Sequence, residues 1–298
     1  MLSILIPTYN YNVFPLVLEL KHQADKLGIN YEILVQDDFS QDFINENYKT
    51  NSLTNCDFSI NSQNLGRGKN INLLCSKSKY EYVLIVEADA LPENEFYLKN
   101  CIEKLSKSTS VLFGGVKYPT IIPPKEKMLR WKYGINRESK SLRYRLKNNY
   151  NFVFTWNLLL KKEILFKHPF PEFINEYGYE DLIFIKNLRQ NSISISHFEN
   201  PLIHHNNEYS IDFIKKSERA VQTLYSLIIE QKIGFKDIKL SSAYLILKRL
   251  YLIGLVKIIY SKNKKQIIQN LISKNPNLYL LDFYKLGYFC SIIPSKNV

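Results

Sequence analysis

Short apolar runs alternate with helical patterns through the first 113 residues, and this alternation constrains the fold more than any other feature. We predict strands at residues 2–6, 31–35, 57–60, 82–86 and 111–113, most of which are largely apolar. Segments with helical spacing of apolar residues lie between them, at 13–27, 66–77 and 93–105. Strands that alternate with helices favour an α/β fold with a mostly parallel sheet and helices on both faces.

Two of the predicted strands end in acidic clusters, Asp37-Asp38 and Glu87-Ala88-Asp89. Ligands of open α/β sheets bind beyond the carboxyl ends of the strands. Carboxylates that converge there repel one another unless a cation or sugar hydroxyls lie between them. The pair in Glu87-Ala88-Asp89 can share Mg²⁺ or Mn²⁺ with the phosphates that such a cation bridges. A solvated turn is the alternative, and it is the commoner one for an isolated acidic triplet.

Three further positions carry groups that could take part in chemistry. Glu180-Asp181 opens a predicted helix, where an ionised Asp181 acts as a general base or simply stabilises the helix dipole. His204 is either a metal ligand or a packed ring. Arg67 follows Gly66 at a loop-to-helix junction, and its guanidinium suits bidentate contacts with phosphate or a base. This junction lacks the spacing of a P-loop.

The rest of the chain changes character twice. Residues 119–151 are less regular and strongly basic, which predicts either a mobile functional loop or a solvated surface loop. Beyond residue 210 the pattern is helical, at 211–230, 243–260, 264–272 and 278–289. We therefore expect an α/β domain at 1–209 and a basic helical extension at 210–298.

The formal net charge of +12 is unevenly distributed. Residues 1–181 carry 23 Lys and Arg against 21 Asp and Glu, whereas residues 182–298 carry 17 against 7. The basic part fits a solvated face, a surface that contacts anionic lipid, or a site for a phosphate-bearing acceptor. No nucleic-acid-binding module is visible, so we expect no nucleic-acid partner. The four cysteines form no CxxC pair, and with no leader pattern at the start this predicts a cytoplasmic protein.

The motifs resemble those of a known family when they are taken in order. They are Ile6-Pro7-Thr8-Tyr9-Asn10, Gln36-Asp37-Asp38-Phe39-Ser40, Glu87-Ala88-Asp89 and Glu180-Asp181. This order is similar to that of the family-2 glycosyltransferases, which have the GT-A fold and are metal-dependent and inverting. Segments such as Asn200-Pro201-Leu202-Ile203-His204 resemble a bacterial subgroup, common in Bacteroidetes, that builds surface polysaccharides.

The resemblance implies a role for each matching residue. Asp181 matches the catalytic base, with Glu180 beside it as an acceptor contact. Asp89 matches a ligand of Mn²⁺ or Mg²⁺, and His204 matches a histidine that completes the metal site. The residues implied in nucleotide-sugar binding are Pro7, Tyr9, Asp38, Arg67, Asn72, Glu87, Ala88, Arg130 and Lys132. Arg130 and Lys132 belong to the loop expected to cover the diphosphate.

Three positions depart from the family pattern. Glu87 stands where the metal motif usually begins with Asp, Phe39 where Gly is usual, and Ile71 where Arg is common.

The resemblance implies sugar transfer from a nucleotide-diphosphate donor, expected to be a UDP-sugar, to a glycan or lipid-linked acceptor. We also expect the protein to make a peripheral contact with the anionic inner face of the membrane. The alternatives are a nucleotide-sugar-binding relative with impaired catalysis, of which Glu87 would be the first sign, and a binder of anionic polymers that uses the basic tail.

Overall fold

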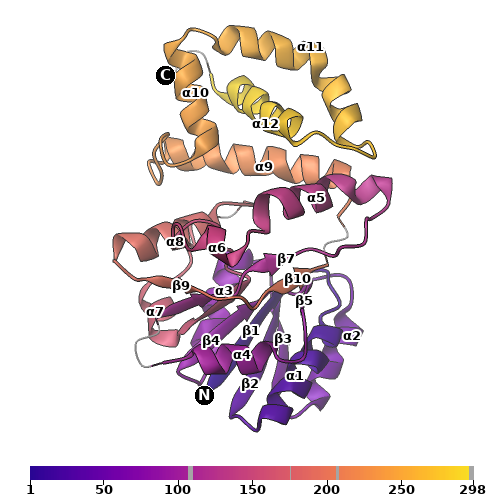
Figure 1. The fold of residues 1–298 in the computed structure, drawn as a ribbon, viewed down its shortest axis with the longest axis vertical. Coiled ribbons are helices and arrows are strands. Elements are labelled where there is room, and N and C mark those ends of the chain that lie inside the picture. Colours follow the sequence, from indigo (N-terminus) through magenta and orange to yellow (C-terminus); the bar gives the residue numbers. More distant parts are fainter. Residues whose placement is uncertain (107–109, 175, 206–207, 295–298) are drawn as a thin grey trace. The chain divides into compact units, whose positions relative to one another are not determined.

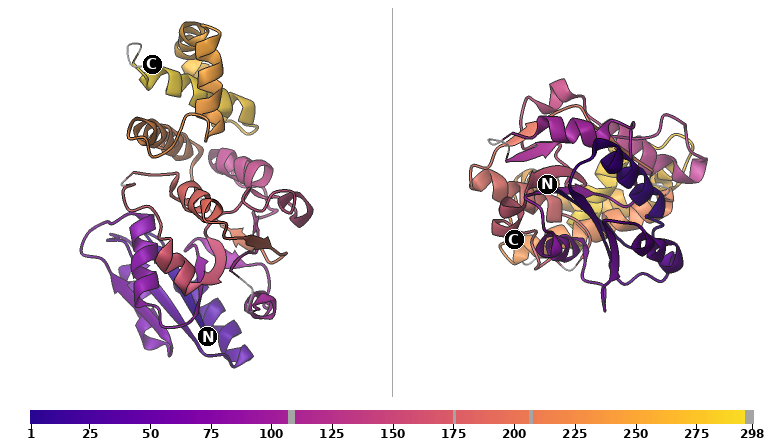
Figure 2. Two further views of the ribbon diagram at one scale, coloured as in Figure 1. Left: turned by 90° about the vertical axis from the view of Figure 1, so that its left-hand side faces the viewer. Right: turned by 90° about the horizontal axis from the view of Figure 1, so that it is seen from below.

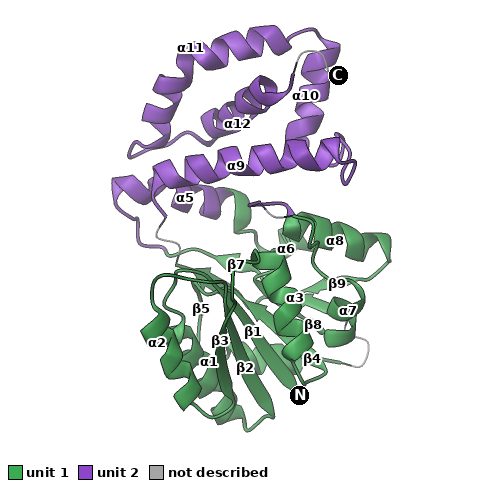
Figure 3. Cartoon of the chain, turned by 180° about the vertical axis from the view of Figure 1, so that it is seen from behind, with its two compact units in different colours: residues 1–119, 137–175, 180–206 green, residues 120–136, 176–179, 207–298 purple. Residues whose placement is uncertain are grey.

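The chain divides into two compact units, shown in green and purple in Figure 3. The computed structural model describes residues 1–106, 110–174, 176–205 and 208–294. Unit 1 consists of residues 1–119, 137–175 and 180–206, and unit 2 of residues 120–136, 176–179 and 207–298. The units interleave along the chain. The functional domain boundary at 209/210 stays a prediction.

Unit 1 is built on a sheet of seven strands in the order β3-β2-β1-β4-β8-β6-β9. Strand β8 runs antiparallel to both of its neighbours, and every other pair in the sheet is parallel. This confirms the expected mostly parallel sheet. The strands are β1 (Leu2–Thr8), β2 (Tyr31–Asp37), β3 (Cys56–Ile60), β4 (Tyr82–Val86), β6 (Val111–Phe113), β8 (Asn157–Lys161) and β9 (Ile195–His197).

The central strands are covered on all sides, which explains their near-continuous apolar sequences. All seven residues of β1 and all seven of β2 are buried. Helices flank the sheet, and α1 packs against α4 while α3 packs against α7 (Figures 1 and 2). The helices and helical turns of this part are α1 (Phe14–Leu27), α2 (Ile44–Tyr48), η1 (Lys49–Ser52), α3 (Arg67–Lys77), α4 (Tyr97–Lys104), α7 (Lys162–Lys167) and α8 (Glu180–Gln190).

A second, three-stranded sheet in unit 1 was not expected from the sequence. Its strands are β5 (Ala90–Pro92), β10 (Leu202–His204) and β7 (Val116–Lys117), in the order β5-β10-β7. Strand β10 runs antiparallel to β5, and His204 is the partner of Ala90. The pairing therefore brings the chain just after Asp89 beside the end of β10.

Residues 119–151 contain more regular structure than we expected. They form the 3-10 turn η2 (Lys125–Lys127), α5 (Met128–Tyr133), the π-helical turn η3 (Gly134–Glu138) and α6 (Leu142–Arg145). The expectation of a largely irregular loop is therefore wrong. The segment is also divided between the units, because residues 120–136 group with the C-terminal helices.

The C-terminal part of unit 2 is helical, as expected. It contains α9 (Ser210–Ile229), α10 (Lys239–Arg249), α11 (Ile253–Leu271) and α12 (Leu278–Ile292). Buried residues of α5, α9, α11 and α12 share one core, which includes Leu129, Ile214, Leu271 and Leu281. The prediction of a single helix at 243–260 is wrong, because Tyr251 adopts a left-handed conformation (φ 58°) that ends α10 before α11 begins. Across the described residues, we find no helix with the length and apolar character needed to cross a bilayer.

Candidate active site

The acidic clusters meet at one edge of the large sheet. Strand β1 lies between β2 and β4 and runs parallel to both, so the carboxyl ends of all three strands lie at the same edge. Asp38 follows the end of β2, and Glu87 follows the end of β4. The sequence prediction that these carboxylates lie at one edge of the sheet is therefore confirmed.

Asp38 is buried and ties the loop before α3 to the end of β2. Its Oδ1 accepts hydrogen bonds from the Leu65 amide (2.7 Å) and from Asn61 Nδ2 (2.9 Å), and its Oδ2 accepts from the Gly66 amide (2.9 Å). The carboxylate thus fixes the turn that delivers Arg67 to the site. Its implied contact with the nucleotide base stays a prediction.

The turn after β2 accommodates one departure from the family pattern. Phe39 has φ 67°, the left-handed conformation in which glycine is usual. Ser40 stabilises this turn, because its amide and hydroxyl donate to the two carboxylate oxygens of Asp37 at 2.7 and 2.6 Å. A non-glycine residue is therefore held here by its neighbours.

Arg67 is the centre of the polar network at this edge. Its Nε and Nη2 donate to the Glu87 carboxylate, at 3.0 Å and 2.9 Å to Oε2. Its Nη1 donates to Asp181 Oδ1 at 2.8 Å and to Thr155 Oγ1 at 3.0 Å. Glu87 and Asp181, which are far apart in the sequence, are therefore bridged by one guanidinium.

Burial and neighbouring charges both shift the pKa values of groups in this network. Burial alone lowers the pKa of Arg67, but the carboxylates of Glu87 and Asp181 outweigh it and raise that pKa, so the guanidinium stays cationic. Burial raises the pKa of Glu87, although Arg67 partly offsets this. Burial also raises the pKa of Glu180, and the neighbouring charge of Asp181 adds to the effect.

Thr155 holds the Asp181 carboxylate from the other side. Its hydroxyl donates to Asp181 Oδ1 at 2.5 Å, and its amide donates to Oδ2 at 3.3 Å. Thr155 is fully buried, and it precedes β8, whereas Asp181 lies in the first turn of α8. No motif marks Thr155 in the sequence, and we did not predict it as a site residue.

Asp89 and His204 form a second polar pair. Asp89 Oδ1 lies 3.3 Å from His204 Nε2, and the Asp89 carbonyl accepts a hydrogen bond from the His205 amide at 2.7 Å. The His204 ring packs against Trp156 and Tyr118, with centroids 4.9 and 5.4 Å apart. Trp156 is the neighbour of Thr155, so this pair adjoins the Arg67 network.

The Asp89–His204 pair suits a divalent cation that also binds substrate phosphates. A carboxylate is a preferred ligand of Mg²⁺ and Mn²⁺, and an imidazole is acceptable to a transition metal such as Mn²⁺. Within the described residues, no group of three or more His, Cys, Asp or Glu side chains is arranged to hold a metal by itself. Two protein ligands leave several coordination positions for phosphate oxygens and water.

Four other residues predicted to bind the nucleotide sugar differ in burial and contacts: Pro7, Tyr9, Asn72 and Ala88. Pro7 lies in β1, Ala88 is buried, and Tyr9 is exposed just beyond the end of β1. The Asn72 side chain anchors a loop, because it donates to the Phe170 carbonyl (3.0 Å) and accepts from the Phe170 amide (2.9 Å). Asn72 thus holds Phe170, whose ring centroid lies 6.0 Å from the Arg67 guanidinium carbon.

Arg130 and Lys132 belong to α5 in unit 2. The Arg130 guanidinium lies over the Phe213 ring, 5.3 Å from its centroid, and Lys132 Nζ donates to Asn275 Oδ1 at 2.5 Å. Both contacts are within unit 2. Their implied place over the donor diphosphate stays a prediction.

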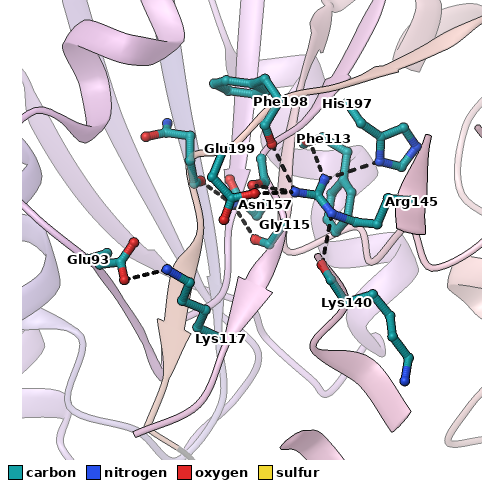
Figure 4. Close-up of polar contacts among 12 residues, drawn as sticks. Glu93, Phe113, Gly115, Lys117, Lys140, Arg145, Asn157, His197, Phe198 and Glu199 are labelled. Carbon is teal, nitrogen blue, oxygen red and sulfur yellow. Dashed lines mark hydrogen bonds and ion pairs between the residues drawn. The ribbon is translucent and has the colours of Figure 1, made fainter. Parts of the chain in front are cut away.

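Arg145 is an unusually buried cation at the end of α6 (Figure 4). Its guanidinium donates to the carbonyls of Phe113, Gly114 and Phe198 at 3.0–3.4 Å. Glu199 accepts at 3.3 Å, and the His197 ring nitrogen lies 3.2 Å away. Burial lowers the pKa of Arg145, and the charge of Glu199 opposes that effect. Arg145 therefore fastens α6 to the segments that follow β6 and β9, and it is no part of a free basic surface.

Gly115 makes room for the Arg145 guanidinium. It has φ 95°, and a Cβ atom at this position would lie 2.6 Å from Arg145 Nη2. Any side chain here would displace the guanidinium from its carbonyl partners.

Comparisons with known proteins agree on the class of protein. The sequence pattern of glycosyl transferase family 2 matches residues 3–167. The fold is similar to that of a mannosyltransferase from Pyrobaculum calidifontis in complex with GDP-Man and Mn²⁺, with a TM-score of 0.58, 15% identity, and coverage of 97% of this chain and 84% of that one. It is also similar to mannosyl-3-phosphoglycerate synthase from Rubrobacter xylanophilus, with a TM-score of 0.54, 15% identity, and coverage of 78% and 75%.

A third similar structure is TarS 1–349 from S. aureus, at 22% identity and a TM-score of 0.47. The match covers 74% of this chain but only 64% of the TarS fragment. No curated protein matches the chain. The structural likenesses confirm the GT-A fold that the motifs implied.

Proposed function

Because this chain belongs to glycosyltransferase family 2, we propose that it transfers a sugar from a nucleotide-diphosphate donor with inversion at the anomeric carbon. The donor is a UDP-sugar, and the acceptor is a hydroxyl of a glycan or a lipid-linked glycan. The observation that carries the proposal is that Asp181 and the Asp89–His204 pair adjoin at one edge of the sheet, linked through Thr155 and Trp156. A base and a phosphate-binding position at one site are what this reaction requires.

Asp89 and His204 are the residues that would hold Mn²⁺ or Mg²⁺. When bound, the cation neutralises the charge that develops on the leaving diphosphate. The Pyrobaculum mannosyltransferase, which has a similar fold, is in complex with GDP-Man and Mn²⁺, and this supports a divalent cation in our proposal. In our proposal Arg130 and Lys132 add positive charge next to the same diphosphate.

Asp181 acts as the base. Its ionised carboxylate takes the proton of the acceptor hydroxyl as the hydroxyl oxygen bonds to the anomeric carbon. The bond from that carbon to the donor phosphate breaks at the same time, and the nucleotide diphosphate leaves with the electron pair. Glu180 contacts the acceptor, and Thr155 fixes the direction in which the Asp181 carboxylate faces.

The nucleotide lies at the ends of β1, β2 and β4. We assign Tyr9 and Asp38 to the base and Glu87 to the ribose, with Pro7, Ala88, Arg67 and Asn72 completing this side of the site. Arg67 already neutralises Glu87, so ribose hydroxyls would meet a paired carboxylate here. We place the enzyme in bacterial surface-polysaccharide synthesis, as in the Bacteroidetes subgroup, on the cytoplasmic side of the membrane. We also propose that the catalytic domain spans residues 1–209 and that the basic helical extension spans residues 210–298.

A screen of nucleotide sugars by thermal shift tests the donor. With Mn²⁺ present, the correct donor at about 100 times its Kd should raise the melting temperature by roughly 5 °C. UDP-sugars should give the largest shifts, and a chelator should remove them. If no nucleotide sugar raises the melting temperature, the proposed donor site is wrong.

Thr155→Val is expected to lower kcat by about tenfold to a hundredfold while leaving donor Kd unchanged, because a hydrogen bond to a charged group contributes about 1.5–3 kcal/mol. Thr155→Ser keeps the hydroxyl and should restore most of the loss. Steady-state kinetics and calorimetric donor titration separate the two parameters. A Thr155→Val variant with normal kcat would show that Thr155 does not position the base.

The second candidate function is a nucleotide-sugar-binding protein without turnover. The observation in its favour is that Glu87 replaces the usual Asp and is engaged by Arg67. Donor binding without transfer or donor hydrolysis, across a panel of acceptors with Mn²⁺, would support this candidate against an active transferase.

A further inference from the structure

The junction between α10 and α11 exposes an unusual concentration of large apolar side chains. Seven such residues are exposed within 14 positions, and we call them the elbow surface: Ile246, Leu250, Tyr251, Leu252, Leu255, Ile258 and Ile259. Tyr251 is 95% exposed. Its left-handed backbone conformation ends α10, so the junction is a sharp break between two helices.

Packing within unit 2 does not account for the elbow surface. Helix α11 already buries one side against the core through Val256, Tyr260 and Ile267. The exposed residues Leu255, Ile258 and Ile259 lie on other sides of the same helix. A helix with apolar residues beyond its core-facing side has a second apolar environment to meet, and exposed patches of this kind mark interaction sites.

The sequence that contains the elbow surface carries charges of one sign only. Residues 238–281 contain eight Lys and Arg and no Asp or Glu. Lys248, Arg249 and Lys257 lie within the elbow itself, and Lys262 and Lys265 follow on α11. The surface therefore combines exposed aliphatic and aromatic groups with a run of cations, of which Lys264 pairs with Glu218 at 3.3 Å.

We propose that the elbow surface docks on an anionic lipid bilayer. The apolar side chains would enter the boundary between headgroups and acyl chains, Tyr251 would sit at the interface that tyrosine prefers, and the lysines would lie at the lipid phosphates. A nucleic acid would use the cations but not seven exposed apolar groups. A second copy would use the apolar groups but would bring two sets of like charges together. This inference rests on the proposed function, which places the enzyme on the cytoplasmic side of the membrane, yet its test involves no donor and no transfer.

Tryptophan fluorescence gives the direct test. Tyr251→Trp should show a blue-shifted emission with vesicles that contain about a third anionic lipid, and quenching by lipids labelled near the headgroup. Phe166→Trp is the matched control, because Phe166 is an exposed aromatic residue (70%) on α7 in unit 1. Spectra of the unmodified protein correct for Trp131 and Trp156. An unshifted Tyr251→Trp emission, or an equal shift at both positions, would overturn the proposal.

Vesicle sedimentation gives the second test. The full chain should bind anionic vesicles far better than neutral ones, and Tyr251→Ser with Leu255→Ser should weaken this binding by roughly a hundredfold, since each apolar side chain contributes about tenfold. Phe166→Ser should bind like the unmodified chain. Two results would refute bilayer docking: equal binding of the double variant, which would indicate charge alone, and a lipid-free dimer that the double variant dissociates, which would indicate an interface between copies.

Discussion

Asp181→Asn should abolish sugar transfer while leaving the nucleotide sugar and the metal bound. The amide cannot accept the acceptor's proton, and loss of a general base typically costs about 10²- to 10⁴-fold in kcat. The fold should survive, because the amide oxygen still accepts from Thr155 and Arg67 keeps its bonds to Glu87. Transfer is measured with the donor found by thermal shift, and donor Kd by calorimetry.

Asp212→Asn is the matched control for this experiment. Asp212 also lies in the first turn of a helix, α9, so both substitutions remove one charge from a helix N-terminal turn. Its only described ion-pair partner is Lys215. Asp212→Asn should transfer normally. If Asp181→Asn transfers within a few fold of the unmodified enzyme, Asp181 is not the base.

Asp89→Ala should reduce donor affinity in Mn²⁺ to the level measured with a chelator. The substitution removes one of the two proposed protein ligands and leaves His204 alone. We expect a loss of about a hundredfold or more, because even changes outside the first coordination shell cost about 10- to 100-fold in metal affinity. Titration of donor with Mn²⁺ and with a chelator measures the metal-dependent part directly.

Glu93→Ala is the control for Asp89→Ala. Glu93 follows β5 closely and pairs with Lys117 at 2.6 Å, so the substitution removes a nearby carboxylate that our proposal does not use (Figure 4). Metal-dependent binding should be unchanged in Glu93→Ala. If Asp89→Ala also binds donor normally with Mn²⁺, then Asp89 does not belong to the metal site.

The sequence predicted the central strands β1, β2 and β4 well because their residues are mostly apolar and buried. Residues 111–113 were predicted exactly where β6 lies, and residues 2–6 and 31–35 fall within β1 and β2. The antiparallel strand β8 and the three-stranded sheet were not predicted. Their pairings join segments far apart in the chain, such as Ala90 with His204, and local patterns carry no information on such contacts.

The helix break at Tyr251 illustrates a different limit of prediction from the sequence. The run from Leu245 to Ile253 is apolar and basic, and it contains neither Gly nor Pro. Such a sequence is typical of a continuous helix, yet Tyr251 takes a left-handed conformation that tyrosine rarely adopts. Helices α10 and α11 each pack against α12 in unit 2, and such tertiary contacts cannot be predicted from the local sequence.

The candidate site was predictable where a carboxylate ends a strand or begins a helix. Asp38, Glu87 and Asp181 were predicted in this way, and the structure brings Glu87 and Asp181 together at Arg67. Thr155 was not, because its role appears only when the start of β8 lies beside the start of α8. Arg145 was misread as one of many loop cations, since nothing in a basic segment tells a buried arginine from a solvated one.

The Arg145 arrangement complicates any genetic search for the catalytic residues. Removing its guanidinium leaves the carbonyls of Phe113, Gly114 and Phe198 without this donor and releases α6 from the sheet. A screen that scores only lost activity would therefore recover Arg145 and Gly115 together with Asp89 and Asp181. Melting curves separate the two classes, since inactive variants that melt normally identify the reaction centre, whereas early melting identifies the scaffold.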